Sequence, residues 1–317
     1  MDTLTEVLEN IRASGALIGQ NLLTAPWSVR VETGSTITVA AMLRGEGWIL
    51  RDGAEPIHLE PRDLAVLTGC GSVLLASDLE GRGAPTCILE PEGVRAQESG
   101  RYLDREALGS RSGGGAGQAA EHALFAGSFP TSGRIAERLL STLPPVLVVP
   151  RAQQRSRALE LLEREIGSCE PGQQAVLDRL LDIVLIGALR DWFALPGTTA
   201  PAWYGAAADP VVGPALSALH DHPEHAWTVE ALAHRARVSR ATFARRFAEV
   251  MGEPPISYLA GWRLCLAADR LQEGDDTFEA IARQVGYSSA YAFSAAFTRE
   301  FGLRPSRYRA QGRGSAA

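Results

Sequence analysis

The sequence predicts an α+β protein of two domains: an N-terminal β-barrel with flanking helices, and a C-terminal all-α domain that contains two helix–turn–helix units. Three observations support this prediction. The first third of the chain contains short β-rich runs broken by glycine and proline, a pattern typical of antiparallel barrels and sandwiches. Nearly everything after residue 210 has helical periodicity. At 317 residues the chain is long enough for two separate cores.

The N-terminal part begins with an expected short helix over residues 2–14, and a β-rich region follows from Trp27 to about Leu89. The runs in this region are short, and they include residues 35–40, 47–50, 63–67 and 72–75. A glycine-rich loop is expected over residues 110–117. Two helices should then follow, over 151–166 and 173–193. The second has a broad apolar stripe, which either packs on its own domain or forms a dimer interface.

Changes in composition divide the chain into four segments. We expect an N-terminal domain over residues 1–195, a linker over 196–209, a helical domain over 210–311 and a disordered tail over 312–317. The linker is rich in proline, glycine and alanine. Within the helical domain, an apolar helix over 256–271 would hold the two helix–turn–helix units at a fixed separation.

The first helix–turn–helix unit covers residues 231–247. Ser239 is expected to cap its second helix, because a serine hydroxyl can accept hydrogen bonds from the free amides of the first turn. The second helix of such a unit enters the major groove of DNA with its N-terminal residues at the base edges. We therefore expect Arg240 and Thr242 to read bases. The phosphate contacts are assigned to the two arginines that follow, Arg245 and Arg246.

The second unit repeats this layout over residues 281–297, and Ser289 lies 50 residues after Ser239. The phenylalanine pairs of the two helices also correspond, and they are expected to face the core: Phe243 and Phe247, Phe293 and Phe297. The outward surface of the second helix has little charge. Its expected contacts with DNA are Ser289, Tyr291, Ser294 and, for phosphate, Arg299.

Charge and hydropathy restrict the possible functions further. The chain has no lysine, so each of its phosphate contacts must come from an arginine. Residues 210–317 hold 13 arginines and 11 acidic residues, a charge of +2, whereas the rest of the chain carries −8. The DNA hypothesis therefore depends on motif geometry more than on bulk charge. No apolar run is long enough to span a membrane, and no export signal is visible, so we expect a cytoplasmic protein.

Residues 211–309 resemble the DNA-binding domain of the AraC/XylS family of transcription regulators. The matching segments are residues 227–233, 239–247, 252–255, 258–259, 262–264, 281–282, 285–287, 293–294, 297, 300–302 and 305–309. The resemblance implies a seven-helix fold and sequence-specific promoter binding. This family usually has glycine in the first turn, where this chain has Arg237, so strain of about 1 kcal/mol is expected there. It often has basic residues at Ala295 and Thr298, so weak base readout is expected of the second unit.

The N-terminal part resembles the cupin-type sensor half of one AraC subgroup. The resemblance lies in residues 43–48, 59–67, 139–147 and 171–180. It implies a cupin-like β-barrel, and barrels of this size can hold one small ligand. Residues that could line such a cavity are Trp27, Met42, Arg44 and Trp48, although core packing is the simpler interpretation of the three apolar ones.

Metal and thiol chemistry have weak support in the sequence. Metal-dependent cupins use several histidines, and here His58 and His122 lie far apart, so we expect no metal, no cofactor and no catalytic residue. His220, His222 and His225 form a cluster that is expected to lie at a helix end. None of the four cysteines forms a Cys-x-x-Cys pair. Buried thiols are the simplest interpretation, and a redox pair of Cys70 and Cys87 remains an alternative.

Together these observations predict a transcription regulator whose promoter binding responds to a small ligand or to a redox signal in the cupin-like domain. The expected partners are double-stranded promoter DNA, an unidentified small-molecule effector, a second copy of the chain and RNA polymerase, with no membrane. The alternative is a cupin enzyme fused to a DNA-binding module. Stoichiometric iron, manganese or zinc in the purified protein would favour that alternative.

Overall fold

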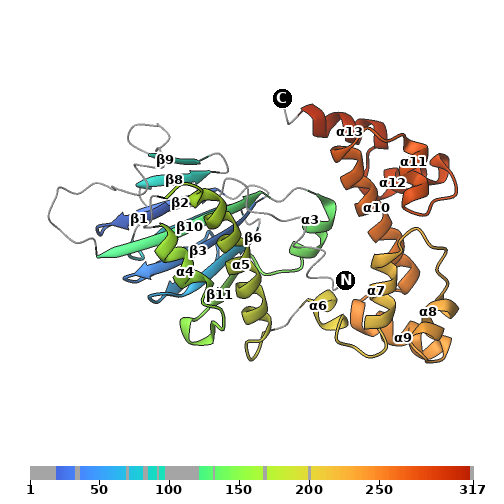
Figure 1. Ribbon diagram of the computed structural model, residues 1–317, viewed down its shortest axis with the longest axis horizontal. Coiled ribbons are helices and arrows are strands. Elements are labelled where there is room, and N and C mark those ends of the chain that lie inside the picture. Colours follow the sequence, from blue (N-terminus) through green and yellow to red (C-terminus); the bar gives the residue numbers. More distant parts are fainter. Residues whose placement is uncertain are drawn as a thin grey trace. The chain divides into compact units, whose positions relative to one another are not determined.

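The computed structural model describes residues 19–32, 36–68, 71–80, 85–90, 93–96, 121–130, 133–166, 170–198 and 201–314 (Figure 1). Its contacts divide the chain into two compact units. The sheet unit comprises the described residues between 19 and 130 and between 143 and 198. The helical unit comprises residues 133–142 and the described residues between 201 and 314. The short segment 133–142 thus groups with the helical unit, although it lies within the N-terminal half of the sequence.

Two sheets form the core of the sheet unit. The five-stranded sheet has the order β1 (Gly19–Leu23), β10 (His122–Pro130), β3 (Thr36–Arg44), β6 (Leu64–Thr68) and β11 (Val146–Val149), and all its pairs are antiparallel. The six-stranded sheet has the order β5 (Ile57–Leu59), β4 (Gly47–Leu50), β7 (Ser72–Ala76), β2 (Ser28–Glu32), β8 (Cys87–Glu90) and β9 (Gly93–Ala96). Its one parallel pair is β2 with β8.

The inner faces of the two sheets share one apolar cluster. It draws Val29 and Leu75 from the six-stranded sheet and Met42, Leu67 and Leu124 from the five-stranded sheet. Strand residues alternate between the two faces of a sheet, so this cluster fixes which side chains point inward. The mixed helix and sheet content predicted from the sequence is confirmed.

Helices α4 (Ala158–Ile166) and α5 (Gln173–Phe193) belong to the sheet unit (Figure 1). Gly127 of β10 permits the close approach of α5, because a Cβ atom at this position would lie 2.7 Å from the Leu181 side chain. The bounds predicted for α5 are confirmed. The helix expected from residue 151 begins later: residues Arg151–Gln153 form a 3-10 turn, whose first amide donates to the Asp63 carboxylate at 2.9 Å.

The helical unit contains nine helices in its described residues. They are α3 (Arg134–Leu140), α6 (Ala202–Ala206), α7 (Gly213–Asp221), α8 (Val229–Arg235), α9 (Arg240–Met251), α10 (Pro255–Glu273), α11 (Phe278–Gln284), α12 (Ala290–Phe301) and α13 (Pro305–Gly314). α6 lies within the segment expected to be a linker. None of the helices in the described ranges of the whole chain combines the length and the apolar character needed to cross a bilayer.

Two cores lie along α10, which runs between the helix pairs α8–α9 and α11–α12 (Figure 1). The first core contains Leu232, Phe243, Phe247 and Tyr258. The second contains Ile281, Phe293, Phe297, Leu264 and Tyr308. All four phenylalanines are fully buried, which confirms the core-facing orientation predicted for them.

Candidate nucleic-acid interface

Both helices of the first pair begin at a side-chain cap. The hydroxyl oxygen of Thr228 accepts a hydrogen bond from the amide of Ala231 at 3.1 Å, at the start of α8. Ser239 accepts one from the amide of Thr242 at 3.2 Å, at the start of α9. These caps satisfy amides that have no partner within their own helix. The predicted capping role of Ser239 is therefore confirmed.

The second pair has the same arrangement. Thr277 accepts from the amide of Ala280 at 3.2 Å, and Ser289 accepts from the amide of Ala292 at 3.2 Å. α11 and α12 thus begin as α8 and α9 do. The repeat that is visible in the sequence is also present in the local hydrogen bonding.

The turns within the two pairs differ in one informative residue. Arg237 has a φ of 56°, in the left-handed region, and the following amide, that of Val238, donates to the carbonyl of Ala233 at 3.1 Å. A residue with a Cβ atom pays about 1–2 kcal/mol for this conformation, so the strain expected at Arg237 is present. Gly286 occupies the equivalent position in the second pair, with a φ of 82° and without this cost.

The N-terminal turn of α9 is exposed and polar. Arg240 forms an ion pair with Glu230 of α8, with Nε 2.9 Å from Oε1, and both side chains are more than half exposed. The hydroxyls of Ser239 and Thr242 lie 2.8 Å apart. Arg245 is also exposed and lies 3.7 Å from the Glu249 carboxylate. A ligand approaching α9 would therefore meet two hydroxyls and a guanidinium that Glu230 already engages.

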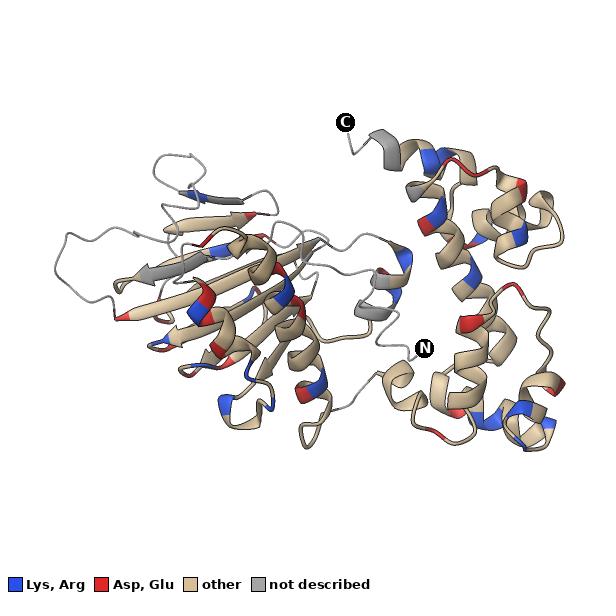
Figure 2. Cartoon of the chain, in the orientation of Figure 1, with Lys and Arg blue, Asp and Glu red and all other residues tan. Residues whose placement is uncertain are grey.

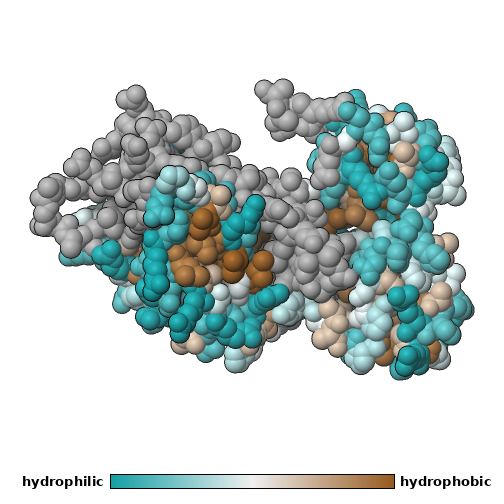
Figure 3. Space-filling model, viewed as in Figure 1, coloured by the Kyte–Doolittle hydropathy of each residue, from teal (hydrophilic) through white to brown (hydrophobic). Residues whose placement is uncertain are grey.

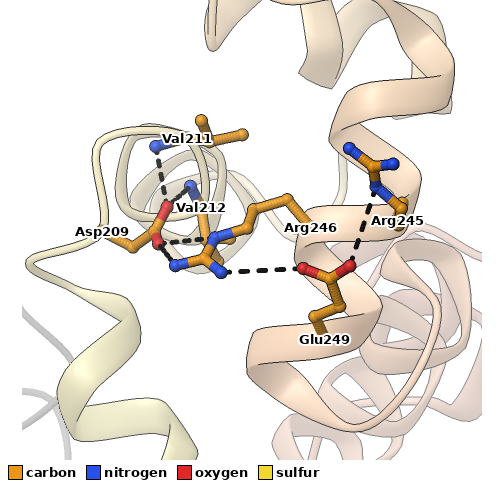
Figure 4. Close-up of polar contacts among 6 residues, drawn as sticks. All are labelled: Asp209, Val211, Val212, Arg245, Arg246 and Glu249. Carbon is orange, nitrogen blue, oxygen red and sulfur yellow. Dashed lines mark hydrogen bonds and ion pairs between the residues drawn. The ribbon is translucent and has the colours of Figure 1, made fainter.

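Arg246, in contrast, is held by acidic neighbours (Figure 4). Its Nε and Nη2 donate to one oxygen of the Asp209 carboxylate, at 3.0 and 2.7 Å. The other Asp209 oxygen accepts from the amides of Val211 and Val212, both at 2.9 Å. Burial alone would raise the pKa of Asp209, but these amide bonds and Arg246 outweigh it and place the pKa below its ordinary value. Arg246 therefore fastens α9 to the segment that leads into α7.

The outward face of α12 carries few charges. Tyr291, in its first turn, is 86% exposed. Ser294 is half-buried, and its carbonyl accepts a hydrogen bond from the Thr298 hydroxyl at 2.7 Å. Arg299 is exposed in the last turn. Both arginines and acidic residues occur along the described helices of the helical unit (Figure 2).

Arg263 of α10 ties the two helix pairs together. Its guanidinium donates to the carbonyls of Pro223 and His225, ahead of α8, at 2.6 and 2.8 Å. It also donates to the carbonyl of Gly286, in the turn before α12, at 3.3 Å. Burial lowers the pKa of Arg263. Glu230, Asp209 and Arg263 were not predicted from the sequence as site residues. The partners of Arg263 lie 23 to 40 positions away in the chain, and the guanidinium partner of Asp209 lies 37 positions away.

The sheet unit separates the four residues assigned to a ligand cavity. Trp27 and Met42 are buried and meet at Gly47, where a Cβ atom would lie 3.3 and 3.1 Å from them. Arg44 is exposed. Trp48 is half-buried on the opposite face of β4 from Ile49 of the core, with its ring centroid 4.6 Å from that of His58.

The indole Nε1 of Trp27 and the Nδ1 atom of His122 are both buried, and neither has a hydrogen-bond partner among the described residues. The two rings lie 5.9 Å apart in an edge-on arrangement. A buried polar atom is costly when unpaired. These two nitrogens are therefore buried polar groups to which the described residues supply no hydrogen bond.

The two cysteines in the described ranges, Cys87 and Cys265, are both buried. Cys87 is buried, and burial raises its pKa to about 11, so the thiol stays protonated. Cys70 lies outside the described residues. His220 bonds the Tyr258 hydroxyl at 2.7 Å within the first core. Where the structure describes the chain, no three His, Cys, Asp or Glu side chains come close enough to hold a metal ion.

Comparisons with known proteins agree with this arrangement. A family model described as Cupin matches residues 2–194, and one described as Helix-turn-helix domain matches residues 232–311. An AraC-like transcription regulator of Streptomyces antibioticus is 34% identical over 314 residues, which cover 98% of each protein. The HTH-type transcriptional regulator AlkR of Acinetobacter baylyi is 35% identical over 179 residues, 55% of this chain and 58% of that protein.

Among solved structures, the DNA-binding domain of AdpA in complex with a target DNA is 34% identical, with a TM-score of 0.32. The match covers 34% of this chain and 96% of that one. The model matches and the full-length relative identify the family. The chain belongs to the AraC-type DNA-binding transcription regulators and combines a cupin N-terminal domain with a C-terminal helix-turn-helix domain.

Proposed function

We propose that the protein binds promoter DNA at two successive major-groove segments, through two helix–turn–helix units formed by α8–α9 and α11–α12. The observation that carries this proposal is the exposed, serine-capped start of α9, with Arg240 and Thr242 beside it. α10 joins this pair to a second pair of the same design. It has 19 residues, so it is roughly 28 Å long, comparable to the spacing of about 34 Å between adjacent major-groove windows.

The polar and charged residues at the start of α9 and along it have separate roles in this proposal. Arg240 leaves Glu230 and donates to a base, guanine being the base that a guanidinium contacts best. Thr242 contacts the neighbouring base, and Ser239 keeps the helix start in place. Arg245 holds a phosphate. Arg246 was assigned to phosphate as well, but its bonds to Asp209 favour a positioning role, because it fixes α9 against the segment before α7.

We assign α12 a weaker part in base recognition. Tyr291 projects from the start of this helix and can pack on a thymine methyl or the sugar–phosphate backbone. Ser289 caps the helix, Ser294 lies on the same outward surface, and Arg299 holds phosphate. The second unit thus adds affinity and register more than sequence discrimination.

The sheet unit is proposed to bind the effector. The unpaired Trp27 and His122 nitrogens, beside the apolar Met42, favour a small molecule with one hydrogen-bonding group on an apolar body. Ligand binding would shift the population of DNA-competent molecules. The high pKa of Cys87 favours this over thiol oxidation, which would need a reactive thiolate. RNA polymerase remains an expected partner at the promoter.

A second copy of the chain is the proposed partner for the α4–α5 surface. Leu161, Val176 and Ile183 are 45 to 50% exposed. Figure 3 shows hydrophobic residues gathered over this region of the sheet unit. An exposed apolar patch of this kind is typical of an interaction surface. Replacing Ile183 and Leu161 by glutamate should convert a dimer into a monomer in analytical ultracentrifugation. A wild-type protein that is itself monomeric would exclude the dimer.

Selection of bound genomic DNA by the purified full chain tests the proposed function. We expect enrichment of a site with two short blocks about one helical turn apart. Arg240→Ala should relax the base preference within one block and leave the other block intact. Arg151→Ala removes an exposed arginine of the sheet unit that lies outside α4 and α5, and it is the matched control. An Arg240→Ala variant that keeps the full wild-type preference would contradict the role of Arg240, and absence of any enriched site would contradict the proposal itself.

A further inference from the structure

One helix of the helical unit comes from the N-terminal half of the sequence. α3 lies in the chain between β10 and β11, two strands of the five-stranded sheet. Only residues 131–133 separate it from β10, and only residues 141–145 separate it from β11. Yet α3 packs on α10, within the helical unit.

The start of α3 is hydrogen-bonded to the C-terminal third of α10. The carboxylate of Asp269 accepts hydrogen bonds from the backbone amides of Arg134 and Ile135, at 2.5 and 3.3 Å. Gly133 makes this approach possible: its φ is 111°, and a Cβ atom there would lie 3.0 Å from the Asp269 carboxylate. The end of the segment is held as well, because the Trp203 indole donates to the Thr142 hydroxyl at 3.0 Å.

Two arginines, one turn apart on α3, reach the two helix pairs separately. Arg138 forms an ion pair with Glu253, at the end of the first pair, at 2.8 Å. It also lies over the ring of Tyr258 from the first core, with Cζ 5.1 Å from the ring centroid.

Arg134 reaches the second pair instead. It donates to the hydroxyl of Tyr308 at 2.8 Å, and its Cζ lies 5.2 Å from the centroid of the Phe301 ring. Tyr308 belongs to the second core, and Phe301 packs against that core. The same short helix therefore contacts both helix pairs of the helical unit.

The contacts of Arg134 and Arg138 are polar, and they do not fill the space between the helices. A cleft of about 720 Å³ remains between α3, α10 and α12, and Arg134, Arg138 and Cys265 are among its lining residues. Ion pairs and cation–π contacts at half-exposed positions are individually weak. A contact of this kind can be released without unfolding either core.

We propose that α3 is a clamp that holds the two helix–turn–helix units in one relative orientation, and that the sheet unit controls DNA binding by seating or releasing it. The inference rests on the proposed function, because it concerns how the two helix–turn–helix units bind DNA. A seated α3 fixes the separation of α9 and α12. A released α3 lets the two units adapt to sites of other spacing. The covalent ties to β10 and β11 make α3 the shortest connection through which a change in those strands could act.

The test uses the full chain and the two-block site obtained by DNA selection, together with versions whose spacing is shortened or lengthened by two base pairs. Two base pairs rotate one block by about 70° relative to the other, given about 10.5 base pairs per turn. We expect the wild-type protein to bind the altered sites at least about tenfold more weakly. The clamp variant Arg134→Gln/Arg138→Gln should lose at most about threefold and should bind a single-block fragment as the wild type does.

The matched control is Arg151→Gln/Arg157→Gln, which removes two exposed arginines from the sheet unit. It should keep the wild-type dependence on spacing. Gly261→Leu is an independent perturbation, because the Arg138 guanidinium lies against this glycine and both arginines are retained. Hydrogen–deuterium exchange of the peptide that contains Arg134 and Ile135 reports whether α3 is seated, since Asp269 protects their amides.

Each outcome has a separate meaning. A wild-type protein that selects no site contradicts the proposed function rather than the clamp. Faster exchange at α3 with an unchanged spacing penalty shows that α3 does not set the geometry and overturns the inference. Unchanged exchange in both the clamp variant and Gly261→Leu overturns it too, because the Arg134 and Arg138 contacts would then not hold α3 in place.

Discussion

The Glu230→Gln substitution offers a direct test of how α9 recognises DNA, because it is expected to strengthen binding. Arg240 must leave the Glu230 carboxylate, 2.9 Å away, before it can donate to a base. Exposed ion pairs of this kind contribute about 0.2–1 kcal/mol. Glutamine keeps the shape of the side chain and removes both this competing pair and a negative charge close to the DNA phosphates.

The expected gain follows from these magnitudes. Removing a penalty of about 0.2–1 kcal/mol corresponds to about 1.4- to fivefold tighter binding. The gain should be largest at low salt, where exposed charges are least screened. Fluorescence anisotropy with a labelled copy of the selected site, over a range of salt concentrations, measures it. Loss of a carboxylate from the first turn of α8 should also lower the free energy of unfolding slightly.

Glu279→Gln is the matched control, because Glu279 occupies the corresponding position in the first turn of α11 after the Thr277 cap. This change removes the same charge without freeing Arg240. Equal gains in both variants would show a general electrostatic effect rather than release of Arg240. Binding by Glu230→Gln that is unchanged or weaker, with Glu279→Gln unaffected, would refute the proposed role of Arg240.

Three further outcomes follow from the helical unit. Arg237→Gly should raise the free energy of unfolding by about 0.5–1 kcal/mol, because relief of left-handed strain exceeds the added entropy of the unfolded chain. Ala236→Gly, at a φ of −78°, should lower the free energy of unfolding. Urea denaturation that ranks the two variants in the opposite order would contradict the strain argument. Ser289→Ala should cost about 1 kcal/mol in the same assay, and Ser289→Thr should restore most of it; a neutral Ser289→Ala would mean that the cap of α12 is dispensable. Because the pKa of Asp209 is lowered in the folded protein, its stabilising contribution is complete above the ordinary aspartate value of 3.8 and is lost as the pH falls through the lower folded value. The stability difference between wild type and Asp209→Asn, measured by thermal unfolding, should therefore be constant near neutral pH and shrink below about pH 4; a difference that grows on acidification would contradict this sign.

Features that depend on neighbouring residues could be predicted from the sequence. The Ser239 and Ser289 caps, the buried phenylalanine pairs and the bounds of α5 follow from hydrogen bonding and apolar periodicity within a few turns of chain. The strain at Arg237 follows from a turn that needs a left-handed residue. Each of these properties is fixed by contacts between residues close in sequence.

The partners of the interface arginines could not be predicted in this way. Arg246 meets Asp209 across 37 residues, and Arg138 meets Glu253 across 115. Both pairs exist only because separate helices pack side by side. The orientation of Trp48 could not be predicted either. The face of β4 that carries Trp48 depends on strand register, and a shift of one residue would exchange the two faces.

The sequence by itself determined the family, the order of the two domains and the local design of the two repeated helix pairs. These are set by short-range backbone hydrogen bonding and by the spacing of apolar residues. The tertiary structure alone decided which charged residues face solvent, which are tied to other elements, and that α3 lies on α10. Ion pairs and docking contacts depend on the three-dimensional proximity of distant segments, and only the packed cores establish that proximity.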